Sequence, residues 1–196
     1  MALRVGALSN LFNPAKRHVV IKKVKIHGYR IFRQFEFIPN PKLNLIIGAN
    51  ESGKSTLLEA IALALTGRVN GSSASEELNP YWFNTSLVQE FVTRRRTGQP
   101  IAFPEIHIEL FFEDRDDLQH LCGAINSEIP TMACPGISIN IVPNPDYAVE
   151  LENWAKKPST ILPVEYYVDD WRDFGDRKIT NRPRQLVTAV IDSRTV

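Results

Sequence analysis

The sequence predicts an α/β fold with a substantial antiparallel β component, and three observations support this prediction. A glycine-rich segment, residues 48–55, lies between a short apolar run and a run of helix-forming residues. Two β-rich runs precede this segment, and a cleanly alternating run, residues 105–113, follows it. Alternation of apolar and polar residues is typical of a strand with one buried face. We expect one domain over residues 19–196, preceded by a flexible arm at residues 1–18.

Residues 48–55 read Gly-Ala-Asn-Glu-Ser-Gly-Lys-Ser, which is the Gly-x-x-x-x-Gly-Lys-[Ser/Thr] pattern of a phosphate-binding loop (P-loop). Gly48 and Gly53 permit backbone conformations that a Cβ disfavours, so that successive N–H groups can surround a phosphate. Lys54 supplies the catalytic cation for the β- and γ-phosphates, and the Ser55 hydroxyl is a ligand for Mg²⁺. The loop therefore predicts binding of ATP with Mg²⁺. The expected contacts are Asn50, Glu51, Ser52, Gly53, Lys54, Ser55 and Thr56.

The segments on either side of the loop have the composition of a strand and a helix. Residues 43–47 are mostly apolar and predict a strand that enters a core. Residues 56–66 are rich in helix formers and end at Gly67, a suitable helix C-cap. A strand, a glycine-rich loop and a helix in this order place a phosphate at the positive end of the helix.

Further elements are predicted on both sides of this unit. Strands are expected at 19–29 and 31–38, and the lysines of the first strand suit a solvated face. After a polar loop at 70–79, a helix at 86–96 ends in three arginines, which suit its negative end. A β-rich insert is expected over about residues 100–196. Its predicted elements are a strand at 105–113, a helix at 114–126 capped by Asp114, a hairpin of residues 136–142 and 147–154, and strands at 164–168 and 186–191.

Composition and charge indicate a globular protein with no strong global attraction to nucleic acid or membrane. The chain has 196 residues, 43% of them hydrophobic, and a formal net charge of +1. Cys122 and Cys134 show no metal-ligand spacing, which favours a reducing compartment. Residues 1–19 contain no apolar signal-peptide core, and no run approaches the length of a membrane span. We expect a cytoplasmic protein with no membrane partner.

Two segments together resemble the N-terminal half of ABC-type ATPases of the SMC and RecF kind. Residues 21–32 are similar to that group's Ile-x-Asn-Phe-Arg-x-Phe strand, and residues 45–56 are similar to its Gly-x-Asn-x-x-Gly-Lys-Ser-Thr loop. The resemblance implies the first lobe of an ABC-type P-loop NTPase head. It also implies that Arg30 reaches the bound nucleotide and that Asn50 belongs to the loop. Gly28-Tyr29 stands where Asn-Phe is usual, so Arg33 remains an alternative to Arg30.

Within this group, residues 161–174 and 191–193 resemble the OLD (overcoming lysogenization defect) family, which includes phage-defence members. That resemblance implies a homodimer or higher homo-oligomer formed through the ATPase heads. ATP hydrolysis would gate a nuclease or toxin effector, fused or in a partner chain, with DNA as a further partner.

ABC-type ATPases also need a Ser-Gly-Gly signature segment and a strand that ends in Asp-Glu, and neither is found in this sequence. Phe111-Phe112-Glu113-Asp114 comes too early in the family order and is interpreted as a strand followed by a helix cap. The acids of a TOPRIM nuclease are not grouped in one α/β unit either. We therefore expect one lobe of a larger ATPase, which would not hydrolyse ATP on its own.

Three hypotheses for the function remain. The first is an OLD-like ATPase module coupled to a nuclease, or a sensor ATPase that controls a separate toxin. The second is a RecF- or SMC-like ATPase of DNA repair or chromosome maintenance without a nuclease; no coiled-coil heptads of the SMC kind follow the loop. The third, a P-loop kinase or transport ATPase, is disfavoured by the long β-rich insert.

Overall fold

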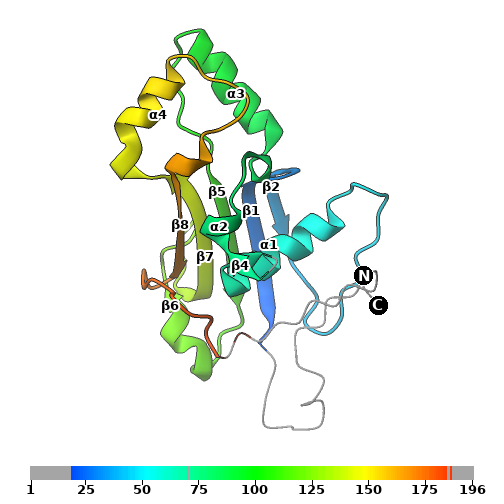
Figure 1. Ribbon diagram of the computed structural model, residues 1–196. Helices are drawn as coiled ribbons and strands as arrows, with labels where there is room; N and C mark the ends of the chain where they lie inside the picture. Colours follow the sequence, from blue (N-terminus) through cyan, green and yellow to red (C-terminus); the bar gives the residue numbers. More distant parts are fainter. Residues whose placement is uncertain (1–18, 70, 185, 187–196) are drawn as a thin grey trace.

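An antiparallel sheet forms the centre of the molecule (Figure 1). The computed structural model describes residues 19–69, 71–184 and 186. Within these ranges the main sheet has six strands in the order β2-β1-β5-β7-β6, and β8 also pairs with β7. Every neighbouring pair in this sheet is antiparallel. The strands are β1 (Ile21–Tyr29), β2 (Phe32–Phe37), β5 (Ile106–Phe112), β6 (Cys122–Gly123), β7 (Cys134–Pro143) and β8 (Tyr167–Asp173).

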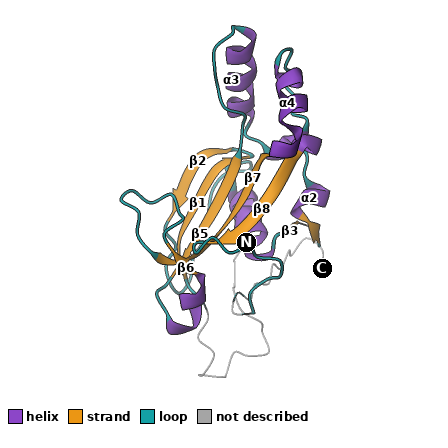
Figure 2. Ribbon diagram, turned by 90° about the vertical axis from the view of Figure 1, so that its left-hand side faces the viewer, coloured by secondary structure: helices purple, strands orange, loops and turns teal. Residues whose placement is uncertain are grey.

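The helices lie in two places. Helix α1 (Lys54–Thr66) crosses one face of the sheet, whereas α3 (Thr85–Arg96) and α4 (Ala148–Ala155) extend beyond one end of it (Figure 2). A two-stranded ribbon, β3 (Arg68–Val69) with β4 (Ser72–Ser73), and the short helix α2 (Ala74–Glu77) follow α1. Short 3₁₀ turns occupy Pro80–Trp82, Asp116–Leu121, Pro145–Tyr147 and Val164–Tyr166. No helix among the described residues is both long and apolar enough to cross a bilayer.

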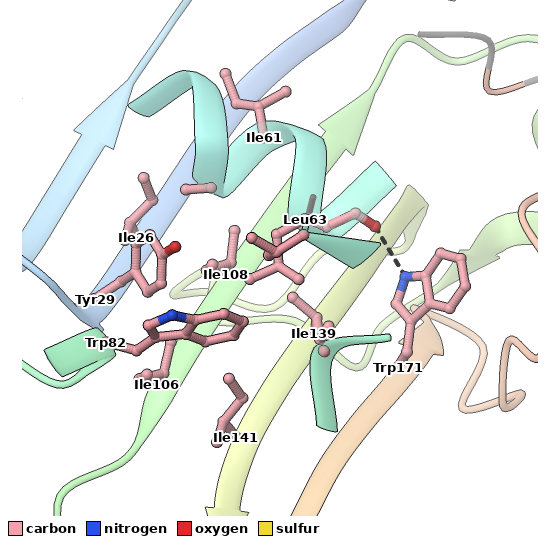
Figure 3. Close-up of a cluster of buried hydrophobic side chains, with 14 of the residues drawn as sticks. Ile26, Tyr29, Ile61, Leu63, Trp82, Ile106, Ile108, Ile139, Ile141 and Trp171 are labelled. Carbon is pink, nitrogen blue, oxygen red and sulfur yellow. Dashed lines mark hydrogen bonds between the residues drawn. The ribbon is translucent and has the colours of Figure 1, made fainter. Parts of the chain in front are cut away.

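The core lies between α1 and the sheet. Alternate residues of β1, β5 and β7 point toward the helix, because successive side chains of a strand point to opposite faces. Ile26, Ile108 and Ile139 come from these three strands and are at most 1% exposed (Figure 3). Helix α1 buries seven side chains: Leu57, Leu58, Ala60, Ile61, Leu63, Ala64 and Leu65. A helix that is apolar over so much of its surface needs cover on more than one side, and Trp82 supplies some of it.

The end of α1 is fixed by a close contact with β8. Gly67 caps the helix with φ of 64°, and its N–H donates to the carbonyl oxygen of Leu63 at 2.7 Å. A Cβ at Gly67 would lie 2.9 Å from the ring of Trp171. The Trp171 Nε1–H in turn donates to the Ala64 carbonyl at 2.9 Å (Figure 3). Glycine at position 67 therefore permits the left-handed backbone conformation and leaves space for the indole ring of Trp171.

The sequence-based expectations hold for the elements near the loop and for the best strand. The strands expected at 19–29, 31–38 and 105–113 form β1, β2 and β5. The helix expected at 56–66 begins two residues earlier, at Lys54, and ends as expected before Gly67. The helix expected at 86–96 forms as α3. The arm at 1–18 and the strand at 186–191, apart from Leu186, lie outside the described residues.

The strand expected at residues 43–47 is not formed. These residues pair with no other strand in the described part of the chain, and Leu43, Leu45 and Ile47 are 69%, 71% and 81% exposed. A strand needs a neighbour for its backbone N–H and C=O groups, so an apolar composition alone is not sufficient to form one.

Four expectations in the rest of the chain are wrong. Residues 147–154 do not pair with β7; they form most of α4, and β7 pairs instead with β5, β6 and β8. The helix expected at 114–126 is a 3₁₀ turn followed by β6, and the Asp114 side chain accepts a hydrogen bond from Gln119 rather than capping a helix. The strand expected at 164–168 begins only at Tyr167. The loop expected at 70–79 contains β4 and α2, with a capping box between Ser73 and Glu76.

The contact between Gly67 and Trp171 generates a stability prediction. Gly67→Ala should destabilise the fold by about 2–5 kcal/mol, because a left-handed residue with a Cβ costs about 1–2 kcal/mol and overpacking adds about 1–3 kcal/mol. Gly98→Ala is the matched control, since Gly98 also has a positive φ, of 72°, but open space around it. Urea unfolding measures both variants. Equal losses of stability at the two positions would contradict the packing argument.

Candidate functional site

Helix α1 begins without the usual cap. Gly53 is its N-cap residue, with φ of 88°, and offers no side chain to the first N–H groups; the first turn contains no acidic residue. Helix α3, by contrast, begins with the Asn84 side chain accepting from the N–H of Leu87. The first N–H groups of a helix have no intrahelical acceptor, and its N-terminus carries a partial positive charge. The start of α1 is therefore suited to an anion.

The loop before α1 is wrapped around the ammonium group of Lys54. The Lys54 Nζ donates to the carbonyl oxygens of Gly48 at 2.7 Å and Ala49 at 2.5 Å, and it lies 3.3 Å from the Ser52 hydroxyl. A Cβ at Gly48 would lie 2.6 Å from that hydroxyl, so a larger residue there would require the Ser52 side chain to move. The loop thus brings a cation and the open helix end to one place.

Gly53 also lets the loop pack closely against the turn that joins β1 and β2. A Cβ at Gly53 would lie 2.4 Å from Ile31 Cδ1 and 2.9 Å from Phe32 Cζ. Such distances leave no room for any other residue without a shift of those side chains. The close approach places the β1–β2 turn, which begins with Arg30, beside the start of α1.

Arg30 adopts an unusual backbone conformation that is held from two sides. Its φ is 49°, in the left-handed region that non-glycine residues rarely occupy. Its N–H donates to the Trp82 carbonyl at 2.7 Å, and its carbonyl accepts from Asn84 Nδ2 at 2.7 Å. The Arg30 side chain donates to Glu59, on α1, at 2.7 Å. Arg33, the alternative to Arg30, instead pairs with Glu90 on α3.

An open hollow of about 450 Å³ lies between these elements. Thr56, in the first turn of α1, faces it from one side, and Arg30 faces it from another. Tyr81 also lines the hollow, with 83% of its surface exposed. The full lining is Arg30, Ile31, Thr56, Tyr81, Phe83, Asn84 and Thr85. The hollow therefore combines a cation, three hydroxyl groups and aromatic surface beside the start of α1.

The predicted site residues are only partly brought together. Gly53, Lys54 and Thr56 form the start of α1, with Arg30 across from them. Asn50, Glu51 and Ser52 lie in the exposed turn before Gly53, and the Ser55 side chain is exposed on the first helical turn. Sequence reasoning missed Tyr81, Asn84 and Glu59. Asn84 had a usable signal, because an Asn before a helix-forming run is a common cap.

The acidic residues after β5 do not join this site. Glu113 pairs with Arg115, and its backbone N–H donates to the carbonyl of Val20, at the start of β1. Arg30 follows the other end of β1. The two positions therefore lie at opposite ends of the strand pair. Within the described ranges, no group of three or more His, Cys, Asp or Glu side chains is arranged to hold a metal.

The comparison with protein families covers most of the chain. A family model described as an AAA domain matches residues 23–186. The chain belongs to this family. The match includes the loop, α1, the hollow and all six strands of the main sheet apart from the first two residues of β1. It confirms the predicted fold class in its coarser form, an AAA-type ATPase domain of mixed α/β structure with an antiparallel sheet.

Curated relatives match shorter segments. The DNA replication and repair protein RecF of Desulforamulus reducens is 43% identical over 47 residues, which are 24% of this chain and 13% of the relative. RecF of Clostridium tetani is 27% identical over 81 residues, 41% of this chain and 22% of the relative. Structural maintenance of chromosomes protein 5 of Arabidopsis thaliana is 45% identical over 47 residues, 24% of this chain and 4% of the relative.

These matches span at most 22% of the length of the three relatives. They support a place for this AAA domain among the ABC-type ATPases of the SMC and RecF group. They give no support to the narrower OLD resemblance or to a nuclease or toxin partner.

Proposed function

We propose that this chain binds ATP with Mg²⁺ through residues 48–56 and that it is the ATP-binding part of an ABC-type ATPase head. The observation that carries the proposal is the Lys54 ammonium, held by its own loop at the uncapped start of α1. A lysine and open N–H groups at one helix end are suited to the β- and γ-phosphates of a nucleotide. The loop carbonyls that now accept from Lys54 keep its charge at that position.

The hollow beside the loop is suited to the nucleoside part of ATP. A nucleoside presents a flat aromatic face and several hydrogen-bonding groups, and the hollow offers Tyr81 together with the polar side chains of Asn84 and Thr85. Thr56 contacts the hollow from the first turn of α1, so that phosphates at the loop and a base at Tyr81 can belong to one ligand. The exposed Tyr81 ring would stack on the base.

The chemistry expected of this chain is positioning and charge neutralisation. Lys54 and the α1 N–H groups would hold the phosphates, and Arg30 would approach them from the β1–β2 turn. When bound, Mg²⁺ neutralises charge on the phosphate oxygens, with the Ser55 hydroxyl as its protein ligand. Such a site takes its other metal ligands from phosphates and water, so it does not require a cluster of acidic side chains.

The domain organisation is part of the proposal. Residues 19–196 would form part of an ABC-type head, with the loop at 48–55 and a β-rich insert over about residues 100–196. The exposed, alternating side chains of Leu43, Leu45 and Ile47 support this arrangement, because a further part of the head packed on this face would bury them. We also propose that two such heads dimerise through the bound nucleotide. The protein would act in the cytoplasm.

For the whole protein, a DNA-associated ATPase is the role that the relatives favour, since their names describe DNA replication and repair and the maintenance of chromosomes. An OLD-like head that gates a nuclease remains a hypothesis on resemblance alone. ATP-dependent DNA binding without strand cleavage by the full-length protein would agree with the first role. ATP-dependent cleavage of DNA would favour the second.

Lys54→Ala should abolish or strongly weaken ATP binding. A charge-assisted contact to phosphate is worth about 1.5–3 kcal/mol, which corresponds to a loss of affinity of about 10- to 150-fold. Isothermal titration calorimetry with ATP measures the change, and Lys42→Ala, an exposed lysine before the loop, is the control. Equal affinity in Lys54→Ala and the parent protein would refute the phosphate-loop proposal.

Ser55→Ala should weaken binding of Mg²⁺–ATP far more than binding of ATP in EDTA, because Lys54 and the N–H groups of α1 remain in place. Thr56→Ala should not show this metal dependence. The two side chains point about 100° apart on the helix, and Thr56 faces the hollow. The measurement is ATP affinity with and without Mg²⁺ for both variants. A metal-dependent loss in Thr56→Ala alone would mean that the metal ligand is assigned to the wrong residue.

A further inference from the structure

The guanidinium group of Arg30 is part of a closed ring of three hydrogen bonds. Its Nη2 donates to Glu59 Oε1 at 2.7 Å, and its Nε donates to the Tyr29 hydroxyl at 3.4 Å. The Tyr29 hydroxyl donates to the same Glu59 oxygen at 2.6 Å. The Nε contact is the longest and weakest of the three, and together they restrain the position and the plane of the guanidinium.

The ring is anchored in β1 and α1, two elements of the core. Tyr29 is fully buried at the end of β1, and Glu59 lies on α1 one turn after Ser55. Burial, together with the hydrogen bond to Glu59, raises the pKa of Tyr29, so its hydroxyl stays protonated and continues to donate at neutral pH. Burial works against the charge of Arg30, but its contacts with Tyr29 and Glu59 outweigh that effect and raise its pKa. Arg30 is therefore held as a cation.

The backbone of Arg30 is restrained as strongly as its side chain. Its left-handed conformation is unfavourable for an arginine, and it is kept by hydrogen bonds to Trp82 and Asn84. A strained residue persists only where its surroundings over-determine it, and such residues concentrate at ligand-binding positions. This one arginine is therefore held by hydrogen bonds to α1, to the end of β1 and to residues 82–84.

The ring also leaves one edge of the guanidinium for a ligand. Its Nε and Nη2 bind Tyr29 and Glu59, whereas among the described residues Nη1 makes no hydrogen bond. The Arg30 side chain is 38% exposed, and the residue lines the hollow beside Thr56. An arginine presents five N–H donors in a fixed planar arrangement, so restraint of one edge determines where the other edge points.

We propose that Glu59 is a positioning residue for the nucleotide: through the ring with Tyr29, it orients Arg30 so that its remaining N–H groups face the ligand in the hollow. This inference rests on the proposed ATP site. A different account of the same contact is that Glu59 competes with phosphate for Arg30 and masks the cation. The two accounts predict changes of opposite sign when the charge of Glu59 is removed.

Glu59→Gln in the full-length protein tests the inference, with ATP affinity as the measurement. The variant keeps the shape of the side chain but weakens its hold on both donors, and we expect ATP to bind about tenfold more weakly, a loss of 1.4 kcal/mol. Glu90→Gln is the matched control, because Glu90 holds Arg33 at the same distance, 2.7 Å, and Arg33, unlike Arg30, does not line the hollow. We expect no change of affinity in that control.

A double-mutant cycle separates positioning from a general structural role. In an Arg30→Ala background, Glu59→Gln should cause no further loss of affinity, because it acts only through Arg30. The inference is overturned if Glu59→Gln alone leaves affinity unchanged, if it tightens binding, or if its loss persists without Arg30. If Lys54→Ala also leaves ATP binding intact, the proposed site itself is wrong rather than the role of Glu59.

Thermal unfolding without nucleotide shows whether Glu59→Gln remains folded. If it does not, Tyr29→Phe gives the second test, since it removes the hydroxyl from the ring and keeps the buried aromatic ring. We expect about threefold weaker ATP binding in Tyr29→Phe, and no further loss when Arg30→Ala is added. Unchanged affinity in Tyr29→Phe would overturn the inference.

Discussion

The close approach of Gly53 to the β1–β2 turn is the constraint on which the candidate site depends. The φ of 88° at Gly53 and its contacts with Ile31 and Phe32 mean that a larger residue would be strained and would displace those side chains. The position of α1 follows from the core, where its apolar side chains cover β1, β5 and β7. Because α1 and the turn are fixed relative to each other, Arg30 in the turn lies beside the start of α1, which carries Lys54 and Thr56.

The elements that were predicted correctly from the sequence are those that short local patterns determine. The loop pattern and the glycine after residue 66 located α1, and strict alternation located β5. Residues 43–47 were predicted wrongly, because the presence of a strand depends on a partner and not on its own apolar side chains. Residues 147–154 were assigned to a hairpin, but β7 finds its partners in β5 and β8, which are distant in sequence. Such pairings depend on the tertiary structure, so a local sequence pattern does not predict them.

The same distinction applies to the site. The residues of the loop could be named from the sequence, whereas Glu59 and Tyr81 could not, and Asn84 could be recognised only as a helix cap; their importance arises from contacts with Arg30 or with the hollow. Glu59 lies 29 residues from Arg30 along the chain, and Asn84 lies 54 residues from it. In the sequence each has an ordinary alternative role, on the surface of a helix or as a cap.

The basic residues that drew attention in the sequence are largely engaged within the protein. Lys23 and Lys25 both pair with Glu128, and Arg95 pairs with Glu152 while lying over the rings of Phe91 and Phe103. These contacts give the cations structural roles in the described part of the chain. A ligand that carries phosphate groups would therefore find the best-placed cations of the described chain at Lys54 and Arg30. We accordingly propose that one nucleotide occupies both the loop and the hollow.

Hydrogen–deuterium exchange with and without Mg²⁺–ATP tests this claim most directly. We expect slower exchange of the backbone amides at residues 48–56 and, in the same sample, at residues 81–85. Protection of the loop alone would contradict the assignment of the hollow to the nucleoside. Unchanged exchange at residues 48–56 in saturating Mg²⁺–ATP would contradict the account as a whole.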